Sequence, residues 1–393
     1  IYPPKLRRIS RDKKSAKKIK IAYLSGEFRQ QATSILLVNL FELHDPEKFE
    51  IYALDNGWND HSHIRQRLES SAHQFIDINK YSDLDVCRLC DEIEIDILIN
   101  LNGYFGRSRN DIFAYRAAPI QVNYLGFPGT MGADYMDYLI ADPVVIPPES
   151  QQYYTEKIAY LPNCYQANDS KRVISEKVFT RTELGLPENA FVFCCFNNNY
   201  KITPDIFTIW MRILQAVPGS VLWLIEDNLA AAKNLKAEAE KRGVSADRII
   251  FAPRMQLAEH LARHRAADLF LDTLPYNAHT TASDALWAGL PVLTCLGTTF
   301  PGRVAASLLK AVGLPELITN SAQEYESMAL DLASHPEKLN ALKEKLAANR
   351  LTKPLFDTER FARDIEKLYT QMYERYQGGL APESMGGFKR LFL

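Results

Sequence analysis

The residues best suited to chemistry gather at 277–289, where a histidine, two threonines and an aspartate stand close together. His279, Thr280 and Thr281 directly precede a run of apolar residues with helical spacing. Either threonine can cap this helix, whose first backbone N–H groups would bind a diphosphate. Asp284, one turn further on, could reach the two hydroxyls of a ribose. An ordinary capped helix has the same spacing, so the residues alone leave both interpretations open.

Three further groups of residues could bind parts of a ligand. Lys201 follows an apolar run at 191–196, in a polar loop where its ammonium group could neutralise a phosphate, although a surface lysine has the same pattern. His260 and Arg263 lie one helical turn apart and could bracket a planar base, but a solvated helix face would look the same. Residues 125–132 hold three glycines and a proline, which predicts a rigid loop whose N–H groups can approach a ligand closely.

Two other patterns resemble metal sites. Asp83 and Asp85 form the D-x-D pattern that holds a metal in one class of sugar transferases. They open a predicted helix over 83–94, however, where acids stabilise the N-terminus by capping and through the helix dipole. Cys87 and Cys90 on the same helix are more simply two small apolar residues one turn apart. We therefore predict no metal.

The composition indicates a large chain of two domains. Its 393 residues are 47% hydrophobic and 24% charged, which is enough to bury more than one core. The formal charge of -2 gives no general attraction to nucleic acid or to an anionic membrane. No apolar run is long enough to span a bilayer and no secretory leader opens the sequence, so we expect a cytoplasmic protein with no nucleic-acid or membrane partner. The six cysteines are scattered, which argues against a disulfide framework.

Strands alternate with helices from residue 19 onward, which predicts mostly parallel sheets wrapped by helices in an α/β fold. The predicted strands are 19–25, 49–54, 74–77, 95–101, 120–124, 191–196, 220–225, 248–251, 267–272 and 292–294. The predicted helices are 33–44, 60–71, 83–94, 203–216, 230–242, 257–265 and 357–376.

These elements divide into two Rossmann-like domains. A basic linker at 1–18 precedes the first domain at 19–180, and a proline-containing stretch with poor periodicity at 141–187 predicts the connection to the second. The second domain covers 187–355. Residues 356–393 hold a long amphipathic helix, which must lie on a large surface, and a tail that we expect to fray.

Five motifs, in this order along the chain, resemble the catalytic region of the O-linked N-acetylglucosamine transferase family, and bacterial members are especially similar. The resemblance covers about residues 19–376. The motifs are YLSGEF at 23–28, LNGY at 101–104, APIQVNYLGFPGTMGA at 118–133, FNNNYK at 196–201 and NAHTTASDALWAG at 277–289.

This resemblance implies a GT-B architecture, in which two Rossmann-like domains face one cleft and the C-terminal helix crosses back to the first domain. It also implies inverting transfer of N-acetylglucosamine from UDP-GlcNAc to a serine or threonine hydroxyl of a protein. The UDP-sugar is a co-substrate, and the family implies neither a cofactor nor a metal.

The resemblance also implies roles for individual residues. On the donor side, Asn198 and Lys201 match residues at the diphosphate, and Lys201 would offset charge on the leaving UDP. Thr280 and Thr281 match residues that contact the phosphates, and Asp284 matches the residue at the ribose. His260 and Arg263 match residues at the uridine. Residues that line the sugar pocket are matched by His279, Gly126 and Pro128. The expected catalytic residues are Lys201 and His279. The expected acceptor-side residues are Gln31 and Asn102.

Two departures from the family pattern bear on function. Many members have a histidine at the position of Gln31, where it is discussed as a base or an acceptor-side residue, and glutamine cannot take up a proton at neutral pH. Tandem helical repeats usually precede this region and hold the protein substrate, and this sequence contains none. Either the chain has been cut, or it finds its acceptor in another way.

Two alternative functions remain open. The first is a related transferase with another donor or acceptor, such as GDP-fucose, UDP-glucose or an asparagine side chain. The second is a catalytically silent module that only binds a nucleotide sugar. Gln31 favours the silent module, whereas intact Lys201, His279 and Asp284 argue against it.

Overall fold

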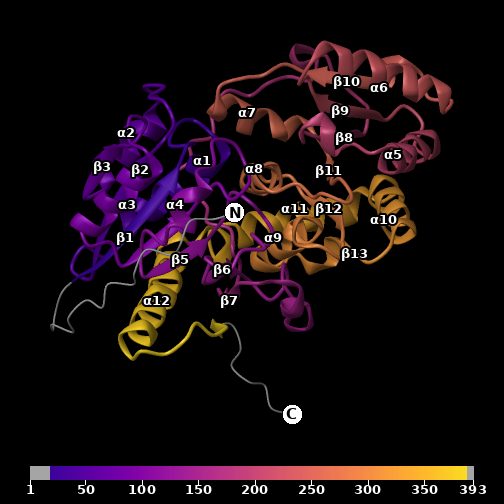
Figure 1. Cartoon of the computed structure of the whole chain (residues 1–393). Coiled ribbons are helices and arrows are strands. Elements are labelled where there is room, and N and C mark those ends of the chain that lie inside the picture. The colour runs from indigo at the N-terminus through magenta and orange to yellow at the C-terminus, as the bar shows by residue number, and fades with distance from the viewer. Residues whose placement is uncertain (1–17, 387–393) are drawn as a thin grey trace. The chain divides into compact units, whose positions relative to one another are not determined.

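A computed structural model describes residues 18–386, and these residues form two compact units. Unit 1 comprises the chain up to Ser170 together with the chain from Asp357 onward, and unit 2 comprises Lys171–Phe356. The first unit therefore ends ten residues before the predicted domain end at 180. Each unit has its own parallel sheet with helices packed around it (Figure 1).

Within the described residues, the sheet of unit 1 has eight strands in the order β14-β7-β6-β5-β4-β1-β2-β3, and every pairing is parallel. The strands are β1 Ile19–Ser25, β2 Phe49–Asp55, β3 Gln74–Asp77, β4 Ile97–Asn100, β5 Ile120–Asn123, β6 Tyr138–Ala141, β7 Lys157–Tyr160 and β14 Met385–Gly386. The α-helices are α1 Ala32–Leu43, α2 His63–Ser71, α3 Asp83–Glu92, α4 Asn110–Ala114 and α12 Thr358–Gln377.

The central strands of unit 1 are buried along their whole length. All residues of β4 and β5 are buried, as expected for a parallel sheet that is covered on both faces. On one face, Cys87 and Cys90 of α3 lie in a core cluster with Ile112 and Phe113 of α4. Both cysteines are free and buried, which confirms their interpretation as small apolar residues.

The long helix α12 belongs to unit 1 although it follows unit 2 in the sequence (Figure 1). Its buried residues Ala362, Ile365, Leu368, Tyr369 and Met372 recur at helical spacing, so one face of the helix is apolar, as predicted. α12 packs against α1 and connects to it through buried polar groups. The returning helix implied by the family resemblance is therefore present.

Within the described residues, unit 2 contains a six-stranded parallel sheet in the order β10-β9-β8-β11-β12-β13. The strands are β8 Val192–Cys195, β9 Val221–Ile225, β10 Ile249–Ala252, β11 Leu269–Leu271, β12 Val292–Cys295 and β13 Ile318–Thr319. The α-helices are α5 Pro204–Ala216, α6 Leu229–Lys241, α7 Leu257–Arg263, α8 Thr280–Ala288, α9 Val304–Val312, α10 Ala322–Ser334 and α11 Pro336–Asn349. None of the helices in residues 18–386 is both long and apolar enough to cross a bilayer.

Two predictions about irregular segments are wrong. The stretch at 141–187 is not simply a connection, because β7 lies within it and pairs with β6 in the sheet of unit 1. The tail does not fray directly after α12, because β14 pairs with β7 and the Ser384 hydroxyl accepts a hydrogen bond from the Ile158 N–H at 3.0 Å. Both strands are held by partners distant in sequence, and local periodicity over two to four residues cannot reveal such pairing.

Candidate active site

The loop between β11 and α8 carries the centre of the predicted site. The N-cap of α8 is His279, and its side chain makes no capping hydrogen bond. The predicted cap is therefore wrong: Thr280 is the first helical residue, and the Thr281 hydroxyl donates to the side-chain oxygen of Asn197. The threonines stand inside the first turn, so the first N–H groups of α8 have no side-chain cap, which leaves this helix end suited to an anion.

Asp272, directly after β11, organises this loop. Its carboxylate accepts hydrogen bonds from the backbone N–H groups of Thr273 at 2.8 Å and Ala278 at 2.6 Å, and from the Thr294 hydroxyl at 2.6 Å. Burial raises the pKa of Asp272 to about 6, against the lowering effect of these hydrogen bonds and of nearby Lys201. Sequence reasoning missed this residue, although an acidic side chain at the end of an apolar strand was a usable signal.

Lys201, in the loop after β8, contacts the loop between β11 and α8. Its ammonium group donates to the carbonyl oxygen of Asn277 at 2.8 Å and lies 4.3 Å from the centroid of the Tyr276 ring. Burial lowers the pKa of Lys201 to about 8, and the attraction of Asp272 opposes this shift. A cation in a site of low polarity interacts strongly with an anion, because little water screens it.

His279 stacks on the same tyrosine, with 4.9 Å between the centroid of its ring and that of Tyr276 and an interplanar angle of 22°. Its Nε2 donates to the carbonyl oxygen of Pro301 at 3.2 Å, which places the ring hydrogen on Nε2. Burial, followed by the charge of Lys201, lowers the pKa of His279 well below its usual value. His279 is therefore neutral near pH 7, and the structure brings both predicted catalytic residues to one aromatic side chain.

The strand order explains why these residues meet. In the sheet of unit 2, β9 and β10 lie on one side of β8, and β11 and β12 lie on the other. The order of the chain reverses between β8 and β11, and ligands of such sheets bind beyond the carboxyl ends of the strands at this switch point. The loops after β8 and β11 carry Lys201 and His279 respectively.

Asn198 lies in the loop after β8, next to the short 3-10 turn Asn199–Lys201. Its side-chain amide, with the nitrogen toward Asp227, donates to the two carboxylate oxygens at 2.8 and 3.1 Å. Arg254 also donates to this carboxylate, at 2.7 Å. Asn198 is thus fixed in position by an acid from the loop after β9, and its predicted diphosphate contact remains a prediction.

His260 and Arg263 occupy one face of α7, but they do not form an open bracket. Arg263 is 0% exposed, donates to the Pro253 carbonyl at 2.5 Å and contacts Nδ1 of His260 at 2.6 Å. Its guanidinium also lies 4.6 Å from the Phe196 ring centroid. Arg263 is thus packed beside His260, and the contact of both residues with uridine remains a prediction.

Asp284 is paired within unit 2. Its carboxylate accepts a hydrogen bond from Arg172 at 2.5 Å, and the Trp287 indole donates to the carbonyl oxygen of Arg172 at 3.1 Å. Burial raises the pKa of Asp284, and the arginine opposes that shift. Sequence reasoning missed Arg172, which stands more than a hundred positions before its partner, and the predicted ribose contact of Asp284 stays a prediction.

Gln31 and Asn102 lie at the corresponding switch point of unit 1, between β1 and β4. The Asn102 side chain is buried and accepts a hydrogen bond from the Gly26 N–H at 2.9 Å, which joins the loops after the two strands. Gln31 is the N-cap of α1, and its side-chain oxygen accepts from the Ala32 N–H at 2.7 Å. A glutamine here therefore has a structural task that requires no proton transfer.

Gly126 and Pro128 lie in the loop after β5, the next strand of the same sheet. A Cβ atom on Gly126 would stand 1.8 Å from the carbonyl oxygen of Leu101, so no other residue fits without moving the backbone. The Gly129 N–H donates to the carbonyl oxygen of Phe127 at 3.0 Å, which closes a turn around Pro128. Packing alone accounts for Gly126, and the predicted contact of this loop with a sugar stays a prediction.

The D-x-D pattern forms a helix cap, as predicted. Ser82 and Asp85 make a capping box at the start of α3, and Asp85 also pairs with Arg88 at 2.8 Å. Asp83 pairs with Arg109 at 2.5 Å. Within residues 18–386, no group of three or more His, Cys, Asp or Glu side chains has an arrangement that could hold a metal ion.

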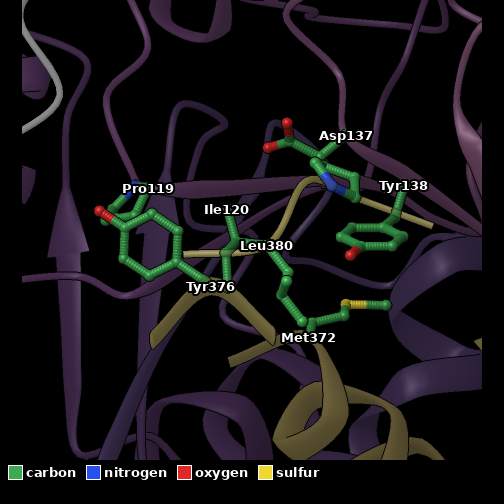
Figure 2. A pocket seen from close by; sticks show the side chains of 8 residues that line it. Pro119, Ile120, Asp137, Tyr138, Met372, Tyr376 and Leu380 are labelled. Atoms are coloured by element: carbon green, nitrogen blue, oxygen red, sulfur yellow. The ribbon is translucent and has the colours of Figure 1, made fainter. Parts of the chain in front are cut away.

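A shallow surface pocket lies in unit 1 and is lined by other residues. Met372 and Tyr376 of α12 line it together with residues at the starts of β5 and β6, namely Pro119, Ile120, Asp137 and Tyr138 (Figure 2). The amino ends of β5 and β6 form this pocket, whereas Gln31 and Asn102 follow the carboxyl ends of their strands. The pocket therefore contains none of the predicted site residues.

The two sheets and their switch points place this chain in a known class of proteins. An O-GlcNAc transferase mutant from Thermobaculum terrenum superposes with a TM-score of 0.85 at 31% identity, over 93% of this chain and 69% of that chain. The chain has the GT-B fold of glycosyltransferases.

Comparison of sequences gives the family. The model of glycosyl transferase family 41 matches residues 4–179 and 171–365, and the chain belongs to this family. A probable UDP-N-acetylglucosamine–peptide N-acetylglucosaminyltransferase SEC of Arabidopsis thaliana is 41% identical over 373 residues, or 93% of this chain and 38% of that protein. A UDP-N-acetylglucosamine–peptide N-acetylglucosaminyltransferase of Caenorhabditis elegans is 28% identical, over 93% of this chain and 42% of that protein. The chain thus spans about two fifths of the length of these curated relatives.

Proposed function

We propose that this chain transfers N-acetylglucosamine from UDP-GlcNAc to serine or threonine hydroxyls of proteins in the cytoplasm, with inversion and without a metal. The observation that carries the proposal is the position of Lys201, a partly buried cation that bonds to the loop directly before the N-terminus of α8. The names of the relatives supply the donor and the acceptor class.

The reaction needs positive charge at the diphosphate. The acceptor hydroxyl attacks the anomeric carbon, the bond from that carbon to the UDP oxygen breaks, and its electron pair leaves on the diphosphate. A single displacement from the opposite face inverts the anomeric centre. The Lys201 ammonium and the first N–H groups of α8 favour the transition state, because the charge on the leaving oxygen grows as the bond breaks.

The proton of the hydroxyl needs an acceptor other than Gln31. Glutamine has no basic group, and its side-chain oxygen caps α1. We propose that the proton passes to a donor phosphate oxygen or to water. His279 contributes by shaping the sugar pocket, because its Nε2 hydrogen is engaged by the carbonyl oxygen of Pro301.

A turnover measurement tests the function. We expect UDP release from UDP-GlcNAc to accelerate when a serine- and threonine-containing peptide is added, and mass spectrometry to find one N-acetylhexosamine per modified hydroxyl. Assays with GDP-fucose and UDP-glucose as donors test whether the chain uses another donor. A peptide whose one possible acceptor is asparagine tests whether it uses another acceptor. Tight UDP binding without any peptide-dependent release would leave the silent binding module as the better assignment.

The same assay tests the role of metal. Activity should survive an excess of EDTA, because Lys201 and α8 supply the charge that a divalent ion supplies elsewhere. Loss of activity that Mg²⁺ or Mn²⁺ restores would contradict the metal-independent mechanism while leaving the transferase assignment in place.

A further inference from the structure

The ammonium group of Lys201 is held by a carbonyl oxygen and an aromatic ring. It donates to the carbonyl oxygen of Asn277 at 2.8 Å, and Nζ lies 4.3 Å from the centroid of the Tyr276 ring. Across residues 18–386, no carboxylate lies close enough to form an ion pair with it. An ammonium group has three N–H donors and the bond to Asn277 uses one, so this cation keeps donors and charge for a ligand.

The charged and titratable neighbours of Lys201 do not neutralise it by contact. Asp272 attracts it from a distance, but the Asp272 carboxylate already accepts hydrogen bonds from two backbone N–H groups and a hydroxyl. The Cys195 thiol stays protonated because burial raises its pKa, and His279 stays neutral because burial lowers its pKa. The aromatic contact is therefore not a supplement to an ion pair.

The ring of Tyr276 is fixed before any ligand arrives. The Thr273 hydroxyl donates to the Tyr276 carbonyl oxygen at 2.7 Å and accepts a hydrogen bond from the Asn197 side chain at 2.7 Å. His279 stacks on the ring itself at an interplanar angle of 22°. Burial raises the pKa of Tyr276 to about 12, so its phenol is neutral and adds no charge near Lys201. A ring held this rigidly can set the position of a cation without having to move.

The face of Tyr276 differs from a carboxylate because it attracts a cation through its quadrupole but carries no net charge. A carboxylate in the same place would also hold the ammonium group, but it would cancel much of the positive charge that an incoming anion feels. We propose that Tyr276 is a positioning residue whose ring face holds the Lys201 ammonium group in place and leaves its charge for the leaving diphosphate. This inference rests on the proposed function, which supplies the diphosphate.

Fluorinated phenylalanines at position 276 test this proposal in the full chain. Fluorine withdraws electrons from the ring face and changes its size little, so each added fluorine weakens the attraction for the ammonium group. Tyr276→Phe should keep kcat within about two-fold of the wild type, because the ring face remains. A trifluorinated phenylalanine should lower kcat about three- to ten-fold relative to phenylalanine, with a smaller change in the KM for UDP-GlcNAc, and Tyr276→Leu should lower kcat at least as much.

The pKa of Lys201 gives a second readout that a space-filling role of the ring would not change. Weaker attraction by the ring lowers the pKa of the ammonium group, so the fall of kcat/KM for the donor at high pH should move about half a pH unit lower across the series. NMR of 13C-labelled lysine side chains follows the same pKa without turnover. A wild-type chain that transfers no sugar would refute the proposed function, and this titration would still decide whether the ring holds the cation.

Lys177 and Phe179 provide a matched control, because Nζ of Lys177 also lies 4.3 Å from a ring centroid and neither residue belongs to the candidate site. Fluorination at position 179 should leave kcat and the pH profile unchanged. In a Lys201→Ala background, the substitutions at position 276 should have no further effect on kcat. An unchanged kcat and pKa across the fluorinated series would overturn the proposal, as would a loss in Tyr276→Phe as large as that in Tyr276→Leu.

Discussion

At the scale of single residues, the chemistry depends most on Lys201. Its hydrogen bond to the carbonyl oxygen of Asn277 and its position beside Tyr276 hold the ammonium group at the loop before α8. We expect Lys201→Ala to lower turnover by about a hundred-fold or more, which is the usual cost of removing one main electrostatic stabiliser of a transition state. The KM for UDP-GlcNAc should change much less. Steady-state kinetics with a saturating peptide measures both values, and turnover near that of the wild type would refute the role.

Asp272 should control the charge of Lys201. Because the attraction of Asp272 raises the pKa of Lys201 while burial lowers it to about 8, kcat/KM for the donor should fall as the pH rises through that region and the ammonium loses its proton. Asp272→Asn removes the attraction, so the fall should begin at a lower pH. Thr319→Ser in β13, at the edge of the same sheet, is a control that should leave the profile in place. If Asp272 had only a structural role, Asp272→Asn would lower kcat/KM but would not change the pH at which kcat/KM falls.

Gln31 should act through a hydrogen bond and not through proton transfer. We expect Gln31→Ala to lower turnover roughly ten-fold or less, because one neutral hydrogen bond at the start of α1 is lost. The pH–rate profile of the wild type should lack an inflection near the usual histidine pKa of about 6.5, and Gln31→His should introduce one. If Gln31→His instead raised turnover by several powers of ten, the natural chain would be better described as an impaired transferase.

The family resemblance implied Lys201 and His279 as catalytic residues, and the sequence pattern placed each of them in a polar loop after an apolar strand, where strand ends meet at one edge of a parallel sheet. Sequence reasoning missed Asp272, whose position at the end of an apolar strand was visible but whose partners were not, and it could not predict Arg172. Asp272 acts on backbone N–H groups, whose positions depend on the folded loop, and Arg172 pairs with a residue far along the chain. Helical spacing placed Arg263 on one face of α7 with His260, but it could not show that Arg263 is buried.

At the scale of elements, the long amphipathic helix was predictable and its attachment was not. Glu366 of α12 contacts Nδ1 of His44 at 3.1 Å and accepts from the Asp45 N–H at 2.7 Å, and Tyr369 shares a hydrogen bond with Tyr23 at 3.1 Å. Burial lowers the pKa of His44, against the pull of Glu366. These contacts join residues more than three hundred positions apart, so only the apolar stripe of α12 is visible in the sequence.

This attachment should stabilise unit 1. Glu366→Ala leaves the Asp45 N–H and the His44 ring without their buried acceptor, so we expect a loss of about 1–3 kcal/mol in the free energy of unfolding. Urea unfolding monitored by hydrogen exchange in unit 1 measures the effect. Lys367→Ala, an exposed neighbour on the same helix, should be close to neutral. Equal stability of the two variants would show that the apolar face alone holds α12 in place.

At the scale of the whole molecule, the predicted residues separate by unit. The predicted acceptor and sugar-loop residues Gln31, Asn102, Gly126 and Pro128 all belong to unit 1. The predicted residues at the base, ribose and diphosphate, together with His279, all lie within Lys171–Phe356. This division follows from the order of the motifs along the chain, so the sequence could predict it, whereas the exact limits of the units depend on long-range contacts.

Because unit 2 is one continuous segment with its own sheet, we expect Lys171–Phe356 to fold alone and to bind UDP. Its affinity should be within about ten-fold of that of the full chain, since the lost contacts would be those to the sugar and the acceptor. UMP should bind about ten-fold more weakly than UDP, because it lacks the second phosphate that Lys201 and the N-terminus of α8 would contact. Calorimetry measures both ligands, after circular dichroism and a cooperative melt have shown that the segment is folded. A folded segment that binds UDP a hundred-fold more weakly than the full chain, or that does not distinguish UDP from UMP, would show that the nucleotide site is not built from these residues.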